Sequence, residues 1–193
     1  MAQRIEGKRV AFVATDGVEQ VELDRPWEAV RQAGGRPELV SLSGGTIRAF
    51  NHLDKGDEKR VDTTVDAANP DDYDALVLPG GVANGDFVRG DANAVRFVRR
   101  FFDAGKPVSV ICHGGWVLTD ADVVRGRTLT SWPTLRTDLR NAGANWVDQE
   151  VVTDKGLVSS RKPDDLDAFC AKMVEEIAEG VHAGQRRSAG ARA

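Results

Sequence analysis

Residues 106–118 read KPVSVICHGGWVL, and this stretch decides how the rest of the chain is interpreted. Residues 108–111 are apolar and mostly β-branched, which is typical of a short strand buried on both faces. Cys112, His113 and two glycines follow at once, and an apolar pattern with helical potential resumes at Trp116. A strand that turns sharply into a helix holds the turn residue at its carboxyl end, where open parallel sheets bind ligands. The pattern therefore predicts a strand, a tight turn and a helix with a cysteine at the corner.

A cysteine at such a corner has a functional and a structural interpretation. The position copies the nucleophile elbow of hydrolases, with cysteine in place of serine. The N-terminus of the following helix favours negative charge, so the pattern predicts a lowered thiol pKa. Glycines after the turn would let backbone N–H groups approach a bound oxyanion. The alternative is a buried structural cysteine, because free cysteines are among the most buried residues in proteins.

The composition restricts the class of protein. The chain has 193 residues, 41% hydrophobic and 29% charged, as expected of one soluble globular domain. A formal net charge of -4 argues against nucleic acid or an anionic membrane as the main partner. The two cysteines lack disulfide or zinc-ligand spacing, and we expect no metal and no cofactor. Without a long apolar run or a signal-peptide pattern, the expected location is the cytoplasm.

Strands alternate with helices along the chain, which predicts an α/β sandwich with a mostly parallel sheet. Residues 1–180 are expected to form one domain, and residues 181–193 a disordered tail. The charged run at 54–60 is interpreted as a solvated loop, and Asp164 or Asp165 as the cap of the last helix. The expected strands are 9–15, 37–43, 61–65, 74–78, 108–111, 128–130, 149–153 and 157–160, and the expected helices are 18–33, 91–104, 116–121, 134–142 and 166–179.

Three strand ends would face one crevice if their strands are parallel neighbours. They carry residues 16–19 (DGVE), 79–81 (PGG) and the Cys112-His113 pair. An ionised carboxylate beside a thiol raises its pKa, whereas a protonated carboxyl donates a hydrogen bond that stabilises the thiolate. The two glycines would offer backbone N–H groups as an anion nest. His113 is a candidate base, although adjacent side chains at an elbow often point apart.

Six motifs together carry a resemblance to a known family. They are VEQVEL (18–23), DALVLPGG (74–81), GKPVSVICHG (105–114), TSWP (130–133), NAGANWVDQEVV (141–152) and SSRKPDDL (159–166). The chain resembles the ThiJ/PfpI family, relatives of the class I glutamine amidotransferases, over roughly residues 8–179. Its likeness is to the PfpI-type intracellular proteases, the general stress proteins grouped with them, and protein deglycases. The resemblance implies a flavodoxin-like, three-layer α/β/α sandwich.

The resemblance also implies roles for residues in these motifs. Cys112 would be the nucleophile, Glu19 the acid that contacts its sulfur, and His113 the adjacent catalytic histidine. Gly80 and Gly81, together with the amide of His113, would form the oxyanion hole.

An assembly is implied as well. In protease-type relatives an acid from a neighbouring subunit orients the histidine, on the loop after the LPGG motif, and Asp86 occupies the matching place. We therefore expect a homo-oligomer, either a dimer or a hexamer built of dimers. Gly115 departs from the family pattern, since many relatives have proline there, and this departure leaves the narrow activity open.

The leading hypothesis is a cysteine hydrolase in which the Cys112 thiolate attacks a carbonyl. Peptide cleavage, hydration of a reactive aldehyde such as methylglyoxal, and removal of early glycation adducts from proteins are all family themes and stay open. The second hypothesis is a redox-responsive stress protein, in which Cys112 is oxidised to sulfinic acid and Glu19 stabilises the product. A glutamine amidotransferase is disfavoured, because the chain has no synthetase domain and no downstream His-x-Glu pair.

Several other residues have a structural interpretation as well as a functional one. Trp116 and Trp132 either line the pocket or belong to the core or an interface. Cys170, in step with apolar neighbours on the last helix, is expected to be buried and inert. His52 and His182 lack partners at useful spacing and are expected to be solvent-exposed.

Overall fold

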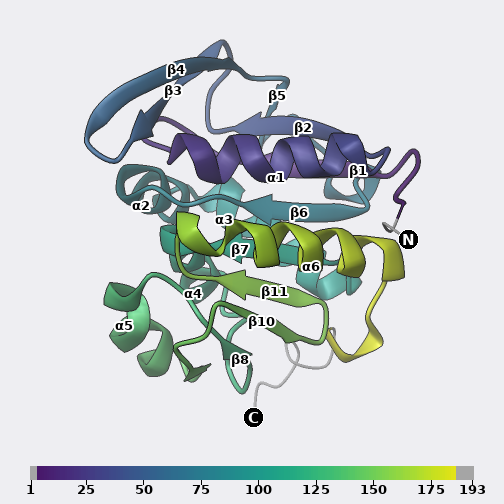
Figure 1. Ribbon diagram of the computed structural model, residues 1–193, viewed down its shortest axis with the longest axis vertical. Coiled ribbons are helices and arrows are strands. Elements are labelled where there is room, and N and C mark those ends of the chain that lie inside the picture. The colour runs from purple at the N-terminus through teal and green to yellow at the C-terminus, as the bar shows by residue number, and fades with distance from the viewer. Residues whose placement is uncertain (1–3, 186–193) are drawn as a thin grey trace.

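A seven-stranded sheet forms the centre of the computed structural model, which describes residues 4–185 (Figure 1). The strand order is β10-β11-β7-β6-β1-β2-β5. Every neighbouring pair is parallel except β10 with β11, so the predicted mostly parallel sheet is confirmed. The strands are β1 (Arg9–Val13), β2 (Arg36–Ser41), β5 (Thr63–Thr64), β6 (Ala75–Leu78), β7 (Val108–Ile111), β10 (Val151–Asp154) and β11 (Leu157–Ser160).

Helices cover both faces of the sheet and complete a three-layer sandwich of flavodoxin-like type. On one face α1 (Gln20–Gln32) and α6 (Leu166–Glu179) lie side by side (Figure 1). The other face carries α2 (Val82–Gly90), α3 (Ala92–Ala104), α4 (Trp116–Asp120) and α5 (Arg136–Asn141). No helix within residues 4–185 has both the length and the apolar character that crossing a membrane requires.

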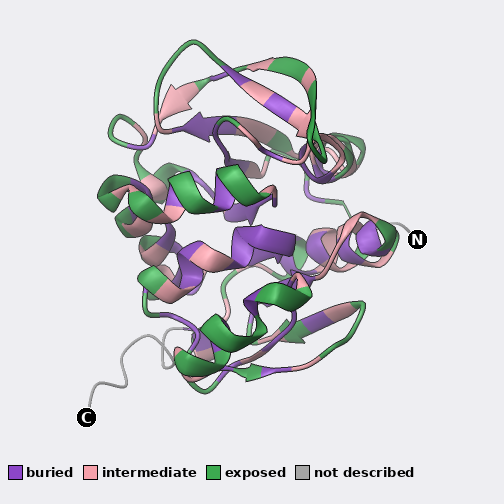
Figure 2. Cartoon of the chain, turned by 90° about the vertical axis from the view of Figure 1, so that its left-hand side faces the viewer, coloured by how far each residue is buried: buried purple, intermediate pink, exposed green. Residues whose placement is uncertain are grey.

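The central strands are apolar throughout because each of their faces is covered. In β6, Leu76 and Leu78 belong to the core beneath α3, whereas Ala75 and Val77 belong to the core beneath α1 and α6. Successive side chains of a strand point to opposite faces, so a doubly covered strand reads as a continuous apolar run. Figure 2 shows the result, with buried residues in the sheet and on inward helix faces, and exposed residues on outward ones.

A hairpin outside the main sheet corrects the prediction of a loop at residues 54–60. There β4 (Asp54–Arg60) pairs antiparallel with β3 (Thr46–Asn51). Ile47 and Ala49 of β3 are buried, whereas most of β4 faces solvent. The prediction was wrong because β4 contributes backbone pairing without an apolar face, and only such a face produces a strand pattern in the sequence.

Other predictions at element boundaries also need correction. The strand expected at 128–130 is β8 (Thr128–Leu129), which pairs with β9 (Asn145–Trp146) in a separate two-stranded sheet. The segment after the LPGG motif is the helix α2, where a loop was expected. Asp165 occupies the N-cap position of α6, but its carboxylate accepts hydrogen bonds from Arg161 and makes no side-chain cap within the described chain.

The prediction of disorder is wrong for residues 181–185, which pack against the rest of the molecule. The His182 N–H donates to the Gly105 carbonyl over 2.7 Å. Gln185 is fully buried, and its carbonyl accepts a hydrogen bond from the buried Arg127 guanidinium over 3.0 Å. The remainder of the predicted tail, residues 186–193, lies outside the described residues.

Candidate functional site

The predicted elbow is present at the carboxyl end of β7. Cys112 has a φ of +59°, in the left-handed region that non-glycine residues seldom adopt. A 3₁₀ turn over Cys112–Gly115 follows and leads into α4. A Cβ on Gly114 would lie 2.5 Å from the Leu78 carbonyl oxygen, so this turn packs against β6 only with glycine there. Parallel pairing of β7 with β6 and β11 holds the strained corner in place.

The acid at the sulfur is Glu22, which corrects the prediction of Glu19. The buried Glu22 carboxyl is within hydrogen-bonding reach of the Cys112 thiol, and its Oε2 accepts from the Gly80 N–H over 3.0 Å. Its Oε1 is buried and has no hydrogen-bond partner within residues 4–185. Glu19 precedes the first helical residue in an extended conformation, and its carboxylate accepts from the His52 N–H over 3.1 Å. Glu22 lies in the first turn of α1, and its carboxyl points into the protein, whereas Glu19 lies before the helix.

Burial controls the ionisation of Glu22. It raises the pKa of Glu22 to about 8, with the nearby Glu19 carboxylate adding to the rise and hydrogen bonds to Cys112 and Gly80 opposing it. At neutral pH most molecules therefore hold a protonated Glu22. A protonated carboxyl donates to a thiolate, whereas an ionised one repels it. The raised pKa makes Glu22 a hydrogen-bond donor to sulfur in the neutral range.

The thiol pKa was predicted to be lowered, and the structure gives the opposite direction. Burial of Cys112, which is 8% exposed, raises its pKa, and an ionised Glu22 would raise it further. The backbone N–H groups of His113 and Gly81 lower it in part. The predicted helix N-terminus contributes little, because a 3₁₀ turn comes before the five-residue α4. Thiolate formation in this site therefore needs a base and hydrogen-bond donors at the sulfur.

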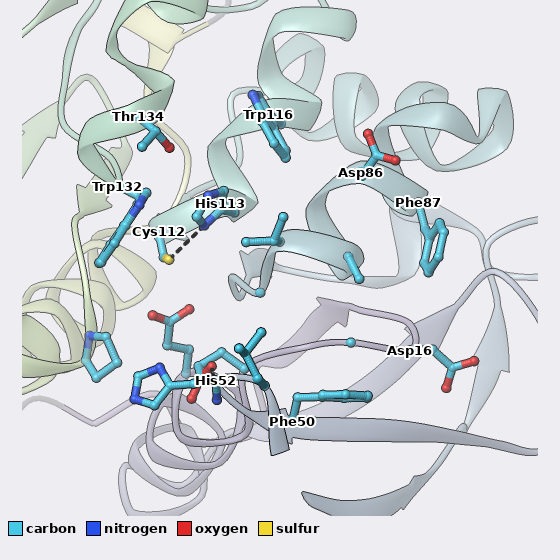
Figure 3. Close-up of a pocket in the computed structure, with 18 residues that line it drawn as sticks. Asp16, Phe50, His52, Asp86, Phe87, Cys112, His113, Trp116, Trp132 and Thr134 are labelled. Carbon is cyan, nitrogen blue, oxygen red and sulfur yellow. Dashed lines mark hydrogen bonds between the residues drawn. The ribbon is translucent and has the colours of Figure 1, made fainter. Parts of the chain in front are cut away.

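His113 lies beside the sulfur, although neighbours at an elbow often point apart. Its Nδ1 is 3.3 Å from the Cys112 Sγ (Figure 3). Burial lowers the pKa of His113, which keeps the imidazole neutral and able to accept the thiol proton. The ring is stacked on Trp132 at a centroid distance of 5.9 Å and meets Trp116 edge-on at 5.2 Å. Both tryptophans line the pocket and hold the imidazole in place.

The two glycines of the LPGG motif have different parts in the site. The Gly80 N–H is engaged by Glu22, so its predicted place in the oxyanion hole is corrected. A Cβ on Gly80 would lie 2.2 Å from the Glu22 Oε2 and 2.6 Å from the Cys112 Cβ, so this glycine makes room for the acid beside the thiol. The amides of Gly81 and His113 do interact with the sulfur, which places two backbone donors where negative charge would develop.

A cavity of about 1020 Å³ opens beside the sulfur. Its mouth exposes large apolar side chains, with Leu53 of the β3–β4 turn 93% exposed and Phe87 of α2 53% exposed. His52 is exposed, as expected, but lines the same cavity because the hairpin brings it there. The lining residues are Asp16, Gly17, Glu19, Glu22, Phe50, His52, Leu53, Gly81, Val82, Ala83, Asp86, Phe87, Cys112, His113, Trp116, Trp132, Thr134 and Pro163.

The remaining candidates lie apart from the sulfur. Asp86 lines the cavity from α2, on the opposite side from Cys112, and is exposed (Figure 3). Cys170 is half-buried on α6, and burial raises its pKa to about 11. His182 is half-buried and its Nε2 lies 3.2 Å from a Glu176 carboxylate oxygen, so the expectation of solvent exposure is wrong.

Known proteins resemble this chain over most of its length. A sequence model of the DJ-1/PfpI family matches residues 8–176. Deglycase PfpI of Pyrococcus furiosus is 41% identical over 167 residues, covering 86% of this chain and 98% of the relative. Protein/nucleic acid deglycase 2 of Escherichia coli is 43% identical over 167 residues, covering 84% and 93%. The crystal structure of Drosophila melanogaster DJ-1beta has a TM-score of 0.81 at 26% identity, covering 89% of this chain and 91% of that one.

Proposed function

Because this chain belongs to the DJ-1/PfpI family, we propose that it is a cysteine-dependent deglycase that removes early carbonyl adducts from protein side chains. The observation that carries the proposal is the arrangement of Glu22, Cys112 and His113 at one corner of a large open cavity. A proton donor, a thiol and a neutral imidazole in contact are the groups that nucleophilic attack on a carbonyl carbon requires.

The chemistry follows from these groups. An early methylglyoxal adduct of an amine is a hemiaminal, and its carbon next to the ketone is the electrophile. His113 takes the thiol proton, the sulfur bonds to that carbon, and the carbon–nitrogen bond breaks as the proton passes to the departing amine. The resulting hemithioacetal becomes a thioester by moving one proton from that carbon to its neighbour through an enediol. Water then releases the hydroxy acid and restores the thiol, with no external oxidant or reductant.

The backbone donors and Glu22 stabilise the charge that forms along this route. The amides of Gly81 and His113 face the sulfur, and the protonated Glu22 adds a third donor. These donors compensate for the raised thiol pKa, because each favours the thiolate over the thiol. They are fixed by the backbone and the helix before substrate arrives, as electrostatic stabilisation requires.

The shape of the cavity favours an adduct carried by a polypeptide over free methylglyoxal. A volume of about 1020 Å³ greatly exceeds what a three-carbon aldehyde fills. The exposed Leu53 at its mouth provides apolar surface for a polypeptide segment next to the modified residue.

A homo-oligomer, in which a second copy covers part of this mouth, is also part of the proposal. Val82 and Phe87 on α2 are exposed apolar residues on either side of Asp86 in the sequence, and burying them would favour association. Analytical ultracentrifugation of Phe87→Ser decides this point: a lower oligomeric order than that of the unaltered chain supports it, and the same order contradicts it.

The function is tested by incubating the protein with a methylglyoxal-treated peptide from which free aldehyde has been removed. Recovered unmodified peptide and released hydroxy acid, produced by the unaltered chain and by Cys170→Ser but not by Cys112→Ser, support the proposal. Conversion of free methylglyoxal alone would reassign the protein as a small-aldehyde hydratase, and cleavage of the peptide backbone would reassign it as a peptidase.

The redox role is the second candidate, and one observation favours it. A Glu22 carboxyl that holds its proton at neutral pH would donate to an oxygen of a sulfinic acid on Cys112. Mass spectrometry after mild peroxide treatment distinguishes the two functions. Rapid sulfinic acid formation without turnover of any adduct would favour the redox role.

A further inference from the structure

We propose that Glu176, Glu179 and His182 form a binding site for a divalent transition-metal ion such as Zn²⁺. One ligand atom from each residue lies within 4.8 Å of those of the other two. The cluster lies at the C-terminal end of α6, at the edge of the molecule opposite the arrowheads of the parallel strands such as β6 and β11 (Figure 1). The 14 residues of α6 span about 21 Å, so this site is separate from the Cys112 cavity at the other end of the helix.

The spacing of the three residues suits a shared ion. Glu176 and Glu179 are three residues apart and therefore lie on the same face of α6. The helix ends at Gly180, whose φ of +82° and ψ of -135° turn the chain back. His182 follows this turn, and its imidazole lies beside the carboxylates of the last helical turn.

The buried polar atoms of the cluster are the second line of evidence. Glu176 is only 6% exposed, yet its Oε2 and the His182 Nε2 have no hydrogen-bond partner within residues 4–185. These two atoms are 3.2 Å apart, which is close enough for an ion pair, but they are not aligned for a hydrogen bond. Two ligands of a tetrahedral Zn²⁺, with bonds of about 2.0 Å, are separated by about 3.3 Å. The observed separation therefore lets these two atoms bind one ion without moving apart.

The imidazole is held in position by the surrounding backbone. A Cβ on Gly156 would lie 2.6 Å from the His182 Cδ2, so only a glycine leaves room for the ring. The His182 N–H donates to the Gly105 carbonyl over 2.7 Å, and its carbonyl accepts from the Gln185 N–H over 3.0 Å. A ligand fixed in this way loses little conformational freedom when the ion binds.

The donor set selects the class of ion. One imidazole nitrogen and two carboxylate oxygens suit Zn²⁺ and its first-row neighbours, whereas Ca²⁺ and Mg²⁺ prefer sites made only of oxygen. Glu179 is exposed, so the cluster can be reached by an ion from solvent. A bound ion would join α6 to the C-terminal segment and stabilise the fold without taking part at Cys112.

The site is tested by equilibrium dialysis of the full-length chain against zinc chloride. We expect one Zn²⁺ per chain in the unaltered protein and in Cys112→Ser, which removes the thiol as a competing ligand. Glu179→Gln and His182→Ala are expected to weaken binding by at least about tenfold. Glu175→Gln is the matched control, because it removes the same charge from the same helix outside the cluster.

A thermal measurement completes the test. Zinc at about 100 times its Kd should raise the Tm of the unaltered chain by about 5 to 10 °C. Glu179→Gln, an exposed substitution that leaves the fold intact, should lose most of this rise. Absence of zinc binding would leave Glu176 and His182 as an ion pair and overturn the proposal. Binding that Glu175→Gln weakens as much as Glu179→Gln does, or that only Cys112→Ser abolishes, would overturn it too.

Discussion

Replacing Glu22 with glutamine gives the most informative perturbation of this molecule. Glutamine has the same shape, so its oxygen can accept from the Gly80 N–H and its amide can donate to the sulfur. It cannot ionise. Glu22→Gln therefore keeps the hydrogen bonds of the protonated acid at every pH and removes only the carboxylate form.

The expected size of the effect comes from the pKa of Glu22, which burial raises from 4.5 to about 8. The folded chain then holds a proton that the unfolded chain releases between these values, so the stability of the unaltered protein falls as pH rises through this interval. About 3.5 pH units corresponds to about 5 kcal/mol at most. Below pH 4.5 the acid and the amide should be nearly equivalent, and by pH 8 Glu22→Gln should be the more stable by several kcal/mol.

Urea unfolding at a series of pH values measures this difference, and the pH dependence of kcat/KM measures its consequence for activity. The unaltered protein should lose activity as pH rises above about 8, because an ionised Glu22 opposes the thiolate, whereas Glu22→Gln should not show this loss. Glu28→Gln, an exposed substitution on the same helix that leaves the surroundings of Glu22 unchanged, is the control and should behave as the unaltered chain does in the urea series. If the stability difference between Glu22→Gln and the unaltered chain stays constant with pH, Glu22 is ionised in the fold and the reasoning is refuted.

Three further substitutions test other parts of the structure. Gly80→Ala should abolish turnover, since its Cβ would lie 2.2 Å from the Glu22 Oε2; an active variant in a deglycation assay would contradict the packing of the acid. Leu53→Ser should raise KM for an adduct on a protein at least severalfold and change the unfolding free energy by less than about 0.5 kcal/mol, because the side chain is 93% exposed. Arg127→Met should lower the unfolding free energy by about 3 kcal/mol, since three carbonyl groups, two of them in buried hydrogen bonds, lose their donor, and urea titration measures it.

The strands that could be predicted from the sequence are those that are buried on both faces of the sheet. β1, β6 and β7 are apolar at nearly every position because both faces are packed, so their patterns were readable without the fold. The sharp turn at Cys112 was predictable for a different reason, because glycines that permit such a turn follow it in the sequence. In contrast, β4 has no apolar face of its own, and its charges favoured a loop.

Tertiary packing decides the features that the sequence did not predict. The segment of α2 contains asparagine and glycine, which have poor helix propensity, yet the Asn84 Oδ1 accepts from the Thr15 N–H and Gly85 packs against the His113 carbonyl. Both contacts join segments far apart in the chain. Glu22 was missed because VEQVEL contains two glutamates three residues apart, and only the start of α1 determines which one points inward.

The central claim is that Cys112 forms a covalent bond to the adduct carbon and releases the amine. The most direct measurement is mass spectrometry of the protein, acid-quenched within one turnover of a methylglyoxal-treated peptide. We expect that Cys112, and not Cys170, carries the mass of one methylglyoxal without the peptide, and that Cys112→Ser carries none. Recovery of unmodified peptide with no adduct on Cys112 at any time of quenching would contradict it.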